Sequence, residues 1–109
     1  MSTTFDDRKK SFETKFQKDQ ELQFKVNNRR NRLLGLWAAA EMGKSGEAAD
    51  AYAKDVVMAD FDKPGDEDVL TKVLTDLTAA GKAIDAAAVR KQMTRLLDAA
   101  KEQVMQEAK

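Results

Sequence analysis

The chain has 109 residues, 42% of them hydrophobic, and its 19 basic and 19 acidic residues give a formal net charge of zero. It lacks the roughly 18 consecutive apolar residues that a membrane-spanning helix needs, and its charged N-terminus has no apolar signal region, so we expect a soluble, cytoplasmic single domain. The absence of cysteine and histidine excludes disulfides, thiol and imidazole catalysis, and Cys/His metal sites.

The charge is unevenly distributed along the chain. Residues 1–32 hold nine Lys or Arg and five Asp or Glu, a net charge of +4, whereas residues 33–109 hold ten and fourteen, a net charge of −4. We therefore expect the two parts to have different roles.

Helix is the favoured secondary structure almost everywhere. One proline and five glycines stand in a chain rich in Ala, Lys, Glu and Leu, and turn residues cluster at positions 43–46, 62–65 and 81–83. These breaks predict four helices. The first starts between Thr4 and Leu22 and ends near Met42, and the others cover residues 47–60, 67–80 and 86–108.

Each predicted helix carries an apolar stripe at helical spacing, and Ser45, Asp66 and Asp85 are the expected N-caps of the last three. The stripe residues are Leu22, Val26, Leu33, Leu34, Leu36, Trp37, Ala49, Tyr52, Ala53, Val56, Val57, Leu70, Val73, Leu74, Leu77, Val89, Met93, Leu96, Leu97, Ala100 and Val104. Short connections favour antiparallel neighbours. The predicted fold is therefore all-α, a small antiparallel four-helix bundle with a long first helix and Trp37 as its largest core residue.

The N-terminal segment differs from the rest of the chain. Before Leu22 the apolar residues are few, and ordering a backbone residue costs about 1 to 2 kcal/mol. We therefore divide the chain into a flexible N-terminal segment, residues 1–20, and a bundle domain, residues 21–109.

Two short motifs resemble ligand-binding loops and are better explained as turns. Gly43-Lys44-Ser45 ends like a phosphate-binding loop, but position 38, where that loop needs glycine, is Ala38, and a helix precedes the motif. Residues 60–65 begin like a calcium loop, but Pro64 has no side-chain oxygen, and Thr71 stands where a glutamate is required. We expect no metal site, no cofactor and no enzyme.

Arg29, Arg30 and Arg32 form a basic cluster on the first predicted helix. A helix spreads these residues over more than half of its circumference, so at most two share a face. The cluster is interpreted either as a solvated face whose arginine stems cover the core, or as a contact to phosphates or to an acidic protein. No aromatic residues for base stacking stand beside it, so we expect no nucleic-acid partner.

Phe5, Phe12 and Phe16 have the spacing i, i+7 and i+11, which places them on one narrow stripe of a helix. The stripe predicts either that the first helix continues and packs on its own bundle, or that the segment folds as an amphipathic helix into a groove on a partner. We favour the partner. The basic residues around the stripe, expected to contact acidic residues of that partner, are Arg8, Lys9, Lys10, Lys15 and Lys18.

Several blocks of the sequence strongly resemble the zeta subunit of the alphaproteobacterial F-type ATP synthase. They are Thr4-Phe5-Asp6-Asp7-Arg8, Phe12-Glu13, Lys15-Phe16, Asn28-Arg29-Arg30-Asn31-Arg32-Leu33-Leu34-Gly35-Leu36-Trp37-Ala38-Ala39, Tyr52-Ala53-Lys54-Asp55-Val56-Val57, Asp60-Phe61 and Gly65-Asp66-Glu67-Asp68-Val69. The resemblance runs from the first residue to about Met105, and its most specific part is residues 30–39.

The resemblance implies a small four-helix protein that binds the catalytic head of the synthase and blocks ATP hydrolysis. It implies that the inhibitory element, here about residues 1–19, enters an interface between the alpha and beta subunits and reaches the gamma subunit. It also implies stronger resistance to rotation in the hydrolysis direction than in synthesis, at the cytoplasmic face of the inner membrane. We expect a monomer when the chain is free.

A nucleotide-sensing module is the alternative function. Weak ADP or ATP binding would use Arg29, Arg30, Arg32 and Lys44, together with helix N-termini. A helix lying on a membrane surface is disfavoured, because acidic residues offset most of the positive charge of the N-terminal segment.

Overall fold

Five α-helices and no strand make up the described part of the chain, residues 4–62 and 65–107 of a computed structural model; side chains are described for residues 10–60 and 65–107. The helices are α1 (Thr4–Lys18), α2 (Gln20–Glu41), α3 (Gly46–Asp62), α4 (Asp66–Ala79) and α5 (Ala86–Glu107). The predicted all-α class is confirmed. The predicted number of helices, four, is wrong, because the long first helix is divided in two.

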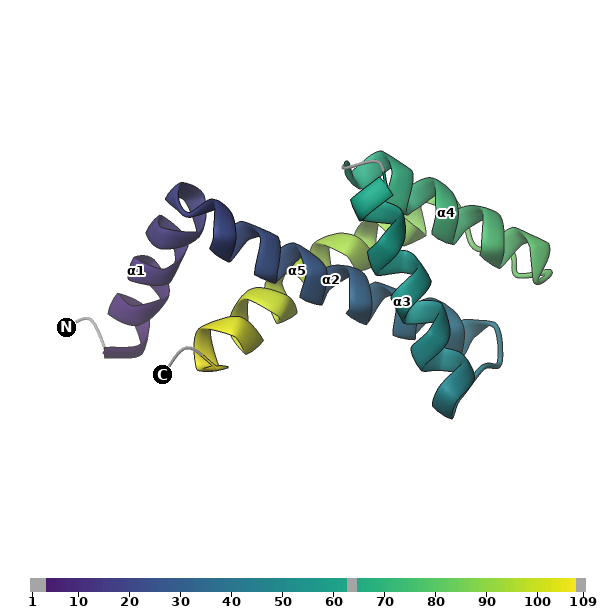
Figure 1. The fold of residues 1–109 in the computed structure, drawn as a ribbon, viewed down its shortest axis with the longest axis horizontal. Helices are drawn as coiled ribbons and strands as arrows, with labels where there is room; N and C mark the ends of the chain where they lie inside the picture. The colour runs from purple at the N-terminus through teal and green to yellow at the C-terminus, as the bar shows by residue number, and fades with distance from the viewer. Residues whose placement is uncertain (1–3, 63–64, 108–109) are drawn as a thin grey trace.

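Asp19 divides that helix. Its backbone leaves the helical region at φ −104° and ψ 107°, and its carboxylate accepts hydrogen bonds from the amides of Glu21 at 3.0 Å and Leu22 at 3.2 Å. Aspartate is one of the preferred N-cap residues because it satisfies amides that a helix start leaves unpaired. The chain therefore turns at Asp19, and α1 points away from the axis of α2 (Figure 1).

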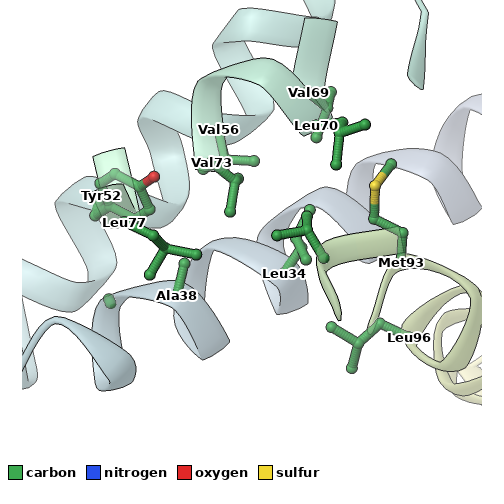
Figure 2. Packing of buried hydrophobic residues seen from close by; sticks show 12 residues of the cluster. Leu34, Ala38, Tyr52, Val56, Val69, Leu70, Val73, Leu77, Met93 and Leu96 are labelled. Carbon is green, nitrogen blue, oxygen red and sulfur yellow. The ribbon is translucent and has the colours of Figure 1, made fainter. Parts of the chain in front are cut away.

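α2 is the central helix and packs against each of the other four. Its C-terminal half forms a first hydrophobic cluster with α3, α4 and the N-terminal half of α5. Figure 2 shows Leu34 and Ala38 of α2 facing Tyr52 and Val56 of α3, the apolar side of α4, and Met93 and Leu96 of α5. Trp37 packs against this cluster but is only partly buried, so the prediction that it is the largest core residue is wrong. Leu34 and Leu77 are the largest fully buried side chains.

Gly35 sets how closely α2 and α3 approach. A Cβ atom at this position would lie 2.6 Å from the Cα of Ala53 and 3.2 Å from a methyl group of Val56. Glycine is therefore the residue that permits this helix contact.

The starts of α4 and α5 differ in how they are capped. Asp85 accepts a hydrogen bond from the amide of Ala88 at 2.9 Å, which confirms it as a cap. The prediction for Asp66 is wrong: Gly65, with φ 145°, precedes α4 without a side-chain cap, and the Asp66 carboxylate accepts a hydrogen bond from Arg30 instead. Within the described residues, no helix is long and apolar enough to cross a membrane.

Candidate partner-binding site

α1 lies with its apolar side against the chain's own helices. Phe12 is only 9% exposed and forms a second hydrophobic cluster with Val26 of α2 and with Ala100 and Val104 of α5. Phe16 is partly buried at the edge of this cluster. No described side chain of α3 or α4 belongs to the cluster, which lies at the end of the molecule where α1 meets the C-terminal half of α5 (Figure 1).

Lys101 of α5 makes two polar contacts with α1. Its ammonium nitrogen lies 3.4 Å from Oε2 of Glu13 and 4.5 Å from the centre of the Phe16 ring. An ion pair of this exposure and a cation–π contact each contribute of the order of 0.5 to 1 kcal/mol. Among the residues whose side chains are described, α1 is thus held mainly by the buried ring of Phe12, the partly buried ring of Phe16 and modest polar contacts.

The solvent-exposed part of α1 is basic. Lys10, Lys15 and Lys18 are exposed and line an open groove that follows α1 to the turn at Asp19 and ends at Glu21. α1 therefore separates an apolar side from a basic side, as the sequence predicts.

The structure accounts for only part of the predicted partner-binding set. The side chains of Phe5, Arg8 and Lys9 lie outside the described residues, although their backbone belongs to α1. Phe12 and Phe16 do pack on the chain's own helices, which is the first of the two interpretations of the stripe. Binding of these residues to another protein, and the flexibility of the segment, stay predictions.

The basic cluster on α2 points in three directions. Arg29 pairs with Glu107 of α5 at 2.6 Å, Arg30 with Asp66 of α4 at 2.8 Å, and Arg32 with Asp50 of α3 at 3.7 Å. The hydrogen bond between Arg29 and Glu107 raises the pKa of the arginine and lowers the pKa of the carboxyl.

Arg30 differs from the expected solvated arginine because its side chain is buried. Its Nε donates a hydrogen bond to Oδ1 of the buried Asn31 at 2.8 Å. Lys44 is exposed and follows the C-terminal end of α2. The structure therefore does not bring the four candidate nucleotide contacts to one face, and nucleotide binding by them stays a prediction.

A polar cluster between α3 and α4 was not anticipated from the sequence. The Tyr52 hydroxyl donates a hydrogen bond to Oδ2 of Asp76 at 2.8 Å, and Lys72 donates to the same oxygen at 3.1 Å. Burial and this hydrogen bond raise the pKa of Tyr52 well above its ordinary value. A single tyrosine in a stripe of core residues carries no sequence signal for its partner.

The carboxylate of Asp60, near the end of α3, contacts the residue that precedes α4. Oδ1 of Asp60 accepts a hydrogen bond from the amide of Gly65 at 3.3 Å. Among the residues described, no three acidic side chains come together as potential metal ligands.

Comparison with known proteins places these features in a family. The family model described as ATPase inhibitor subunit zeta matches residues 1–103. A solution NMR structure of a protein that is 49% identical in sequence superposes with a TM-score of 0.70, and the match covers 79% of this chain and 98% of that one. No curated protein matches the chain. The chain therefore belongs to the ATPase inhibitor subunit zeta family, whose members are regulatory inhibitors of the ATP synthase rather than enzymes.

Proposed function

We propose that the chain inhibits ATP hydrolysis by inserting its N-terminal segment, residues 1–20, into an interface between the alpha, beta and gamma subunits of the catalytic head. The observation that carries this proposal is the form of α1, an amphipathic helix separated from α2 by a turn at a single residue, Asp19. Membership of the zeta family supports the catalytic head as the partner.

Such a helix inhibits without chemistry of its own. A catalytic interface in a rotary enzyme has to open and close in each cycle, and a helix inside it prevents closure and stops rotation in the hydrolysis direction. Burying a phenylalanine ring contributes about 1.5 to 3 kcal/mol, so Phe12 and Phe16 supply apolar anchoring. Lys10, Lys15 and Lys18 supply charge for acidic residues of the head.

Insertion requires α1 to leave α2 and α5, since Phe12 is already buried against them. The exchange replaces one set of apolar contacts by another, so its net cost is far smaller than that of exposing the ring to water. Because α1 is already helical, part of the ordering cost of a flexible segment is avoided. The turn at Asp19 is where the direction of α1 can change without disrupting α2.

The test is a titration of ATP hydrolysis by an isolated alphaproteobacterial catalytic head that carries no inhibitor. The full chain and a chain that starts at Gln20 are compared, and their helix content is measured by circular dichroism. Inhibition by the full chain alone supports the proposal. Full inhibition by the shortened chain, or none by the full chain, contradicts it.

The remaining expectations belong to the same proposal. The inhibitor acts at the cytoplasmic face of the inner membrane, through the synthase, and is a monomer when free. Weak ADP or ATP binding at Arg29, Arg30, Arg32 and Lys44 is a separate alternative. An amide-shift titration that shows no saturable change with millimolar ADP would exclude it.

A further inference from the structure

Two large hydrophobic side chains of the described residues are exposed, and they lie on neighbouring helices. Phe24 of α2 is 52% exposed and Met58 of α3 is 54% exposed. Each lines an open hollow, and the two hollows share Val57 and Arg32. They therefore form one continuous surface, called here the α2/α3 surface, with Phe24, Val57 and Met58 as its apolar residues.

This surface is basic in a chain whose net charge is zero. Its lining residues include four cations, Lys25, Arg29, Arg32 and Lys54, and a single carboxylate, Glu21. The two arginines have partners in Glu107 and Asp50 beside the hollows. Lys25 and Lys54 form no ion pair within 4 Å to any described residue, although Lys25 is near enough to Glu107 to help lower the pKa of that carboxyl.

The α2/α3 surface continues into the basic side of α1. Glu21 lines both its first hollow and the groove that Lys10, Lys15 and Lys18 border. A partner in contact with the basic side of α1 can therefore extend past Asp19 and Glu21, the two carboxylates at the turn, onto α2 and α3.

We propose that the α2/α3 surface is a second docking surface for the catalytic head, and that it binds an acidic protein surface that presents apolar side chains. This inference rests on the proposed function and extends it. The N-terminal segment blocks the catalytic interface, whereas the α2/α3 surface anchors the rest of the chain beside it. Anchoring one part of a chain raises the effective concentration of the other part at its own site.

A protein suits this surface better than a lipid bilayer does. The apolar residues line hollows between two helices, whereas a membrane-binding helix presents one continuous convex apolar face. Arg29 and Arg32 are held in place by carboxylates, so their charges have fixed positions. A folded protein surface can match fixed charges with a complementary arrangement of its own.

The experiment compares full-length variants with the wild-type chain. Lys25→Glu combined with Lys54→Glu reverses the two lysine charges of the surface, and Phe24→Ser combined with Met58→Ser removes its exposed apolar groups. The matched control is Lys82→Glu combined with Lys91→Glu, which reverses two exposed lysines outside the surface. Circular dichroism confirms that all variants are folded.

Two quantities are measured on the isolated head, the dissociation constant and the residual hydrolysis at saturating inhibitor. We expect both surface variants to bind about tenfold more weakly. Residual hydrolysis at saturation stays at the wild-type level, because the N-terminal segment is intact. Binding of the charge-reversed variant also depends less on salt, and the control binds like the wild-type chain.

The outcomes separate the two proposals. Surface variants that bind as tightly as the wild-type chain overturn the docking surface and leave the inhibitor function intact. Wild-type chain that binds without inhibiting overturns the proposed function, while weaker binding of the variants still supports the surface. A wild-type chain that does not bind the head overturns both. The assignment to a protein partner is overturned if the wild-type chain binds vesicles that contain anionic lipid and the same surface variants do not.

Discussion

The ammonium group of Lys101 in α5 lies 3.4 Å from the carboxylate of Glu13 in α1. The same ammonium lies over the ring of Phe16, one turn further along α1. Two residues of the proposed inhibitory segment are therefore occupied by the chain's own C-terminal helix. Any partner that takes up Phe12 and Phe16 has to compete with this intramolecular contact. Its apparent affinity equals its intrinsic affinity multiplied by the fraction of chains in which α1 is released.

Weakening the contact is therefore expected to strengthen inhibition. Lys101→Ala removes an ion pair and a cation–π contact that together are worth about 1 kcal/mol, which shifts the equilibrium toward released α1. We expect half-maximal inhibition of hydrolysis at a roughly two- to fivefold lower concentration. Lys91→Ala, on the exposed side of α5, serves as the control. An inhibitor weakened by Lys101→Ala would show that Lys101 acts on the partner instead.

Fixing α1 to α5 is expected to abolish inhibition. The chain contains no cysteine, so Glu13→Cys combined with Lys101→Cys provides one defined pair of thiols. A cleavable cross-linker between them prevents α1 from leaving, and reduction releases it. The measurement is hydrolysis by the catalytic head before and after reduction, with the single-cysteine variants treated in parallel. Cross-linked chain that inhibits as well as reduced chain would contradict the need for release.

Much of the core is predictable from spacing alone. Most stripe residues on α2 to α5 are buried in the structure, among them Leu34 and Leu77, whereas others such as Val57 are only partly buried. Spacing predicts the core because a helix whose apolar residues recur every three or four positions has only one apolar face to bury. The position of the N-terminal segment is less predictable, since Phe12 and Phe16 fit an intramolecular and an intermolecular groove equally well.

Most features that the sequence did not predict are interactions between residues far apart in the chain. Arg30 is buried because Asn31 beside it and Asp66 of α4 accept its hydrogen bonds, and a basic cluster in the sequence does not specify where α4 lies. The turn at Asp19 does have a local signal, a capping residue, but the helical pattern on both sides conceals it. The structure also gives physical reasons for the specificity of residues 30–39, which supply the buried arginine that pairs with Asp66, a core leucine and the close contact at Gly35.

Gly35 provides a test in which two effects have opposite signs. Replacing glycine by alanine in an exposed helix stabilises it by about 1 kcal/mol. At Gly35 the new methyl group would meet the backbone of Ala53 at 2.6 Å, and overpacking of this kind costs about 1 to 3 kcal/mol. We expect Gly35→Ala to lower the free energy of unfolding, measured by urea denaturation. A more stable variant would mean that α2 and α3 separate at little cost.

Tyr52 predicts how stability depends on pH in alkaline solution. Burial and the hydrogen bond to Asp76 raise its pKa above the ordinary value of 10.0, so the folded chain keeps the phenol proton to higher pH than the unfolded chain does. Above pH 10 the unfolded state therefore binds fewer protons, and the free energy of unfolding falls as pH rises from the ordinary pKa toward the folded one.

Two measurements check this prediction. Tyr52 is the only tyrosine of the chain, so phenolate absorbance reports its ionisation alone, and the folded chain should titrate above pH 10. In Tyr52→Phe, the alkaline loss of stability should be shallower, although the variant is less stable at neutral pH because Asp76 loses a hydrogen-bond donor. A midpoint at the ordinary value in a chain that stays folded would show that the hydroxyl is not held by Asp76. Unfolding monitored by circular dichroism at each pH separates titration of the folded chain from titration after unfolding.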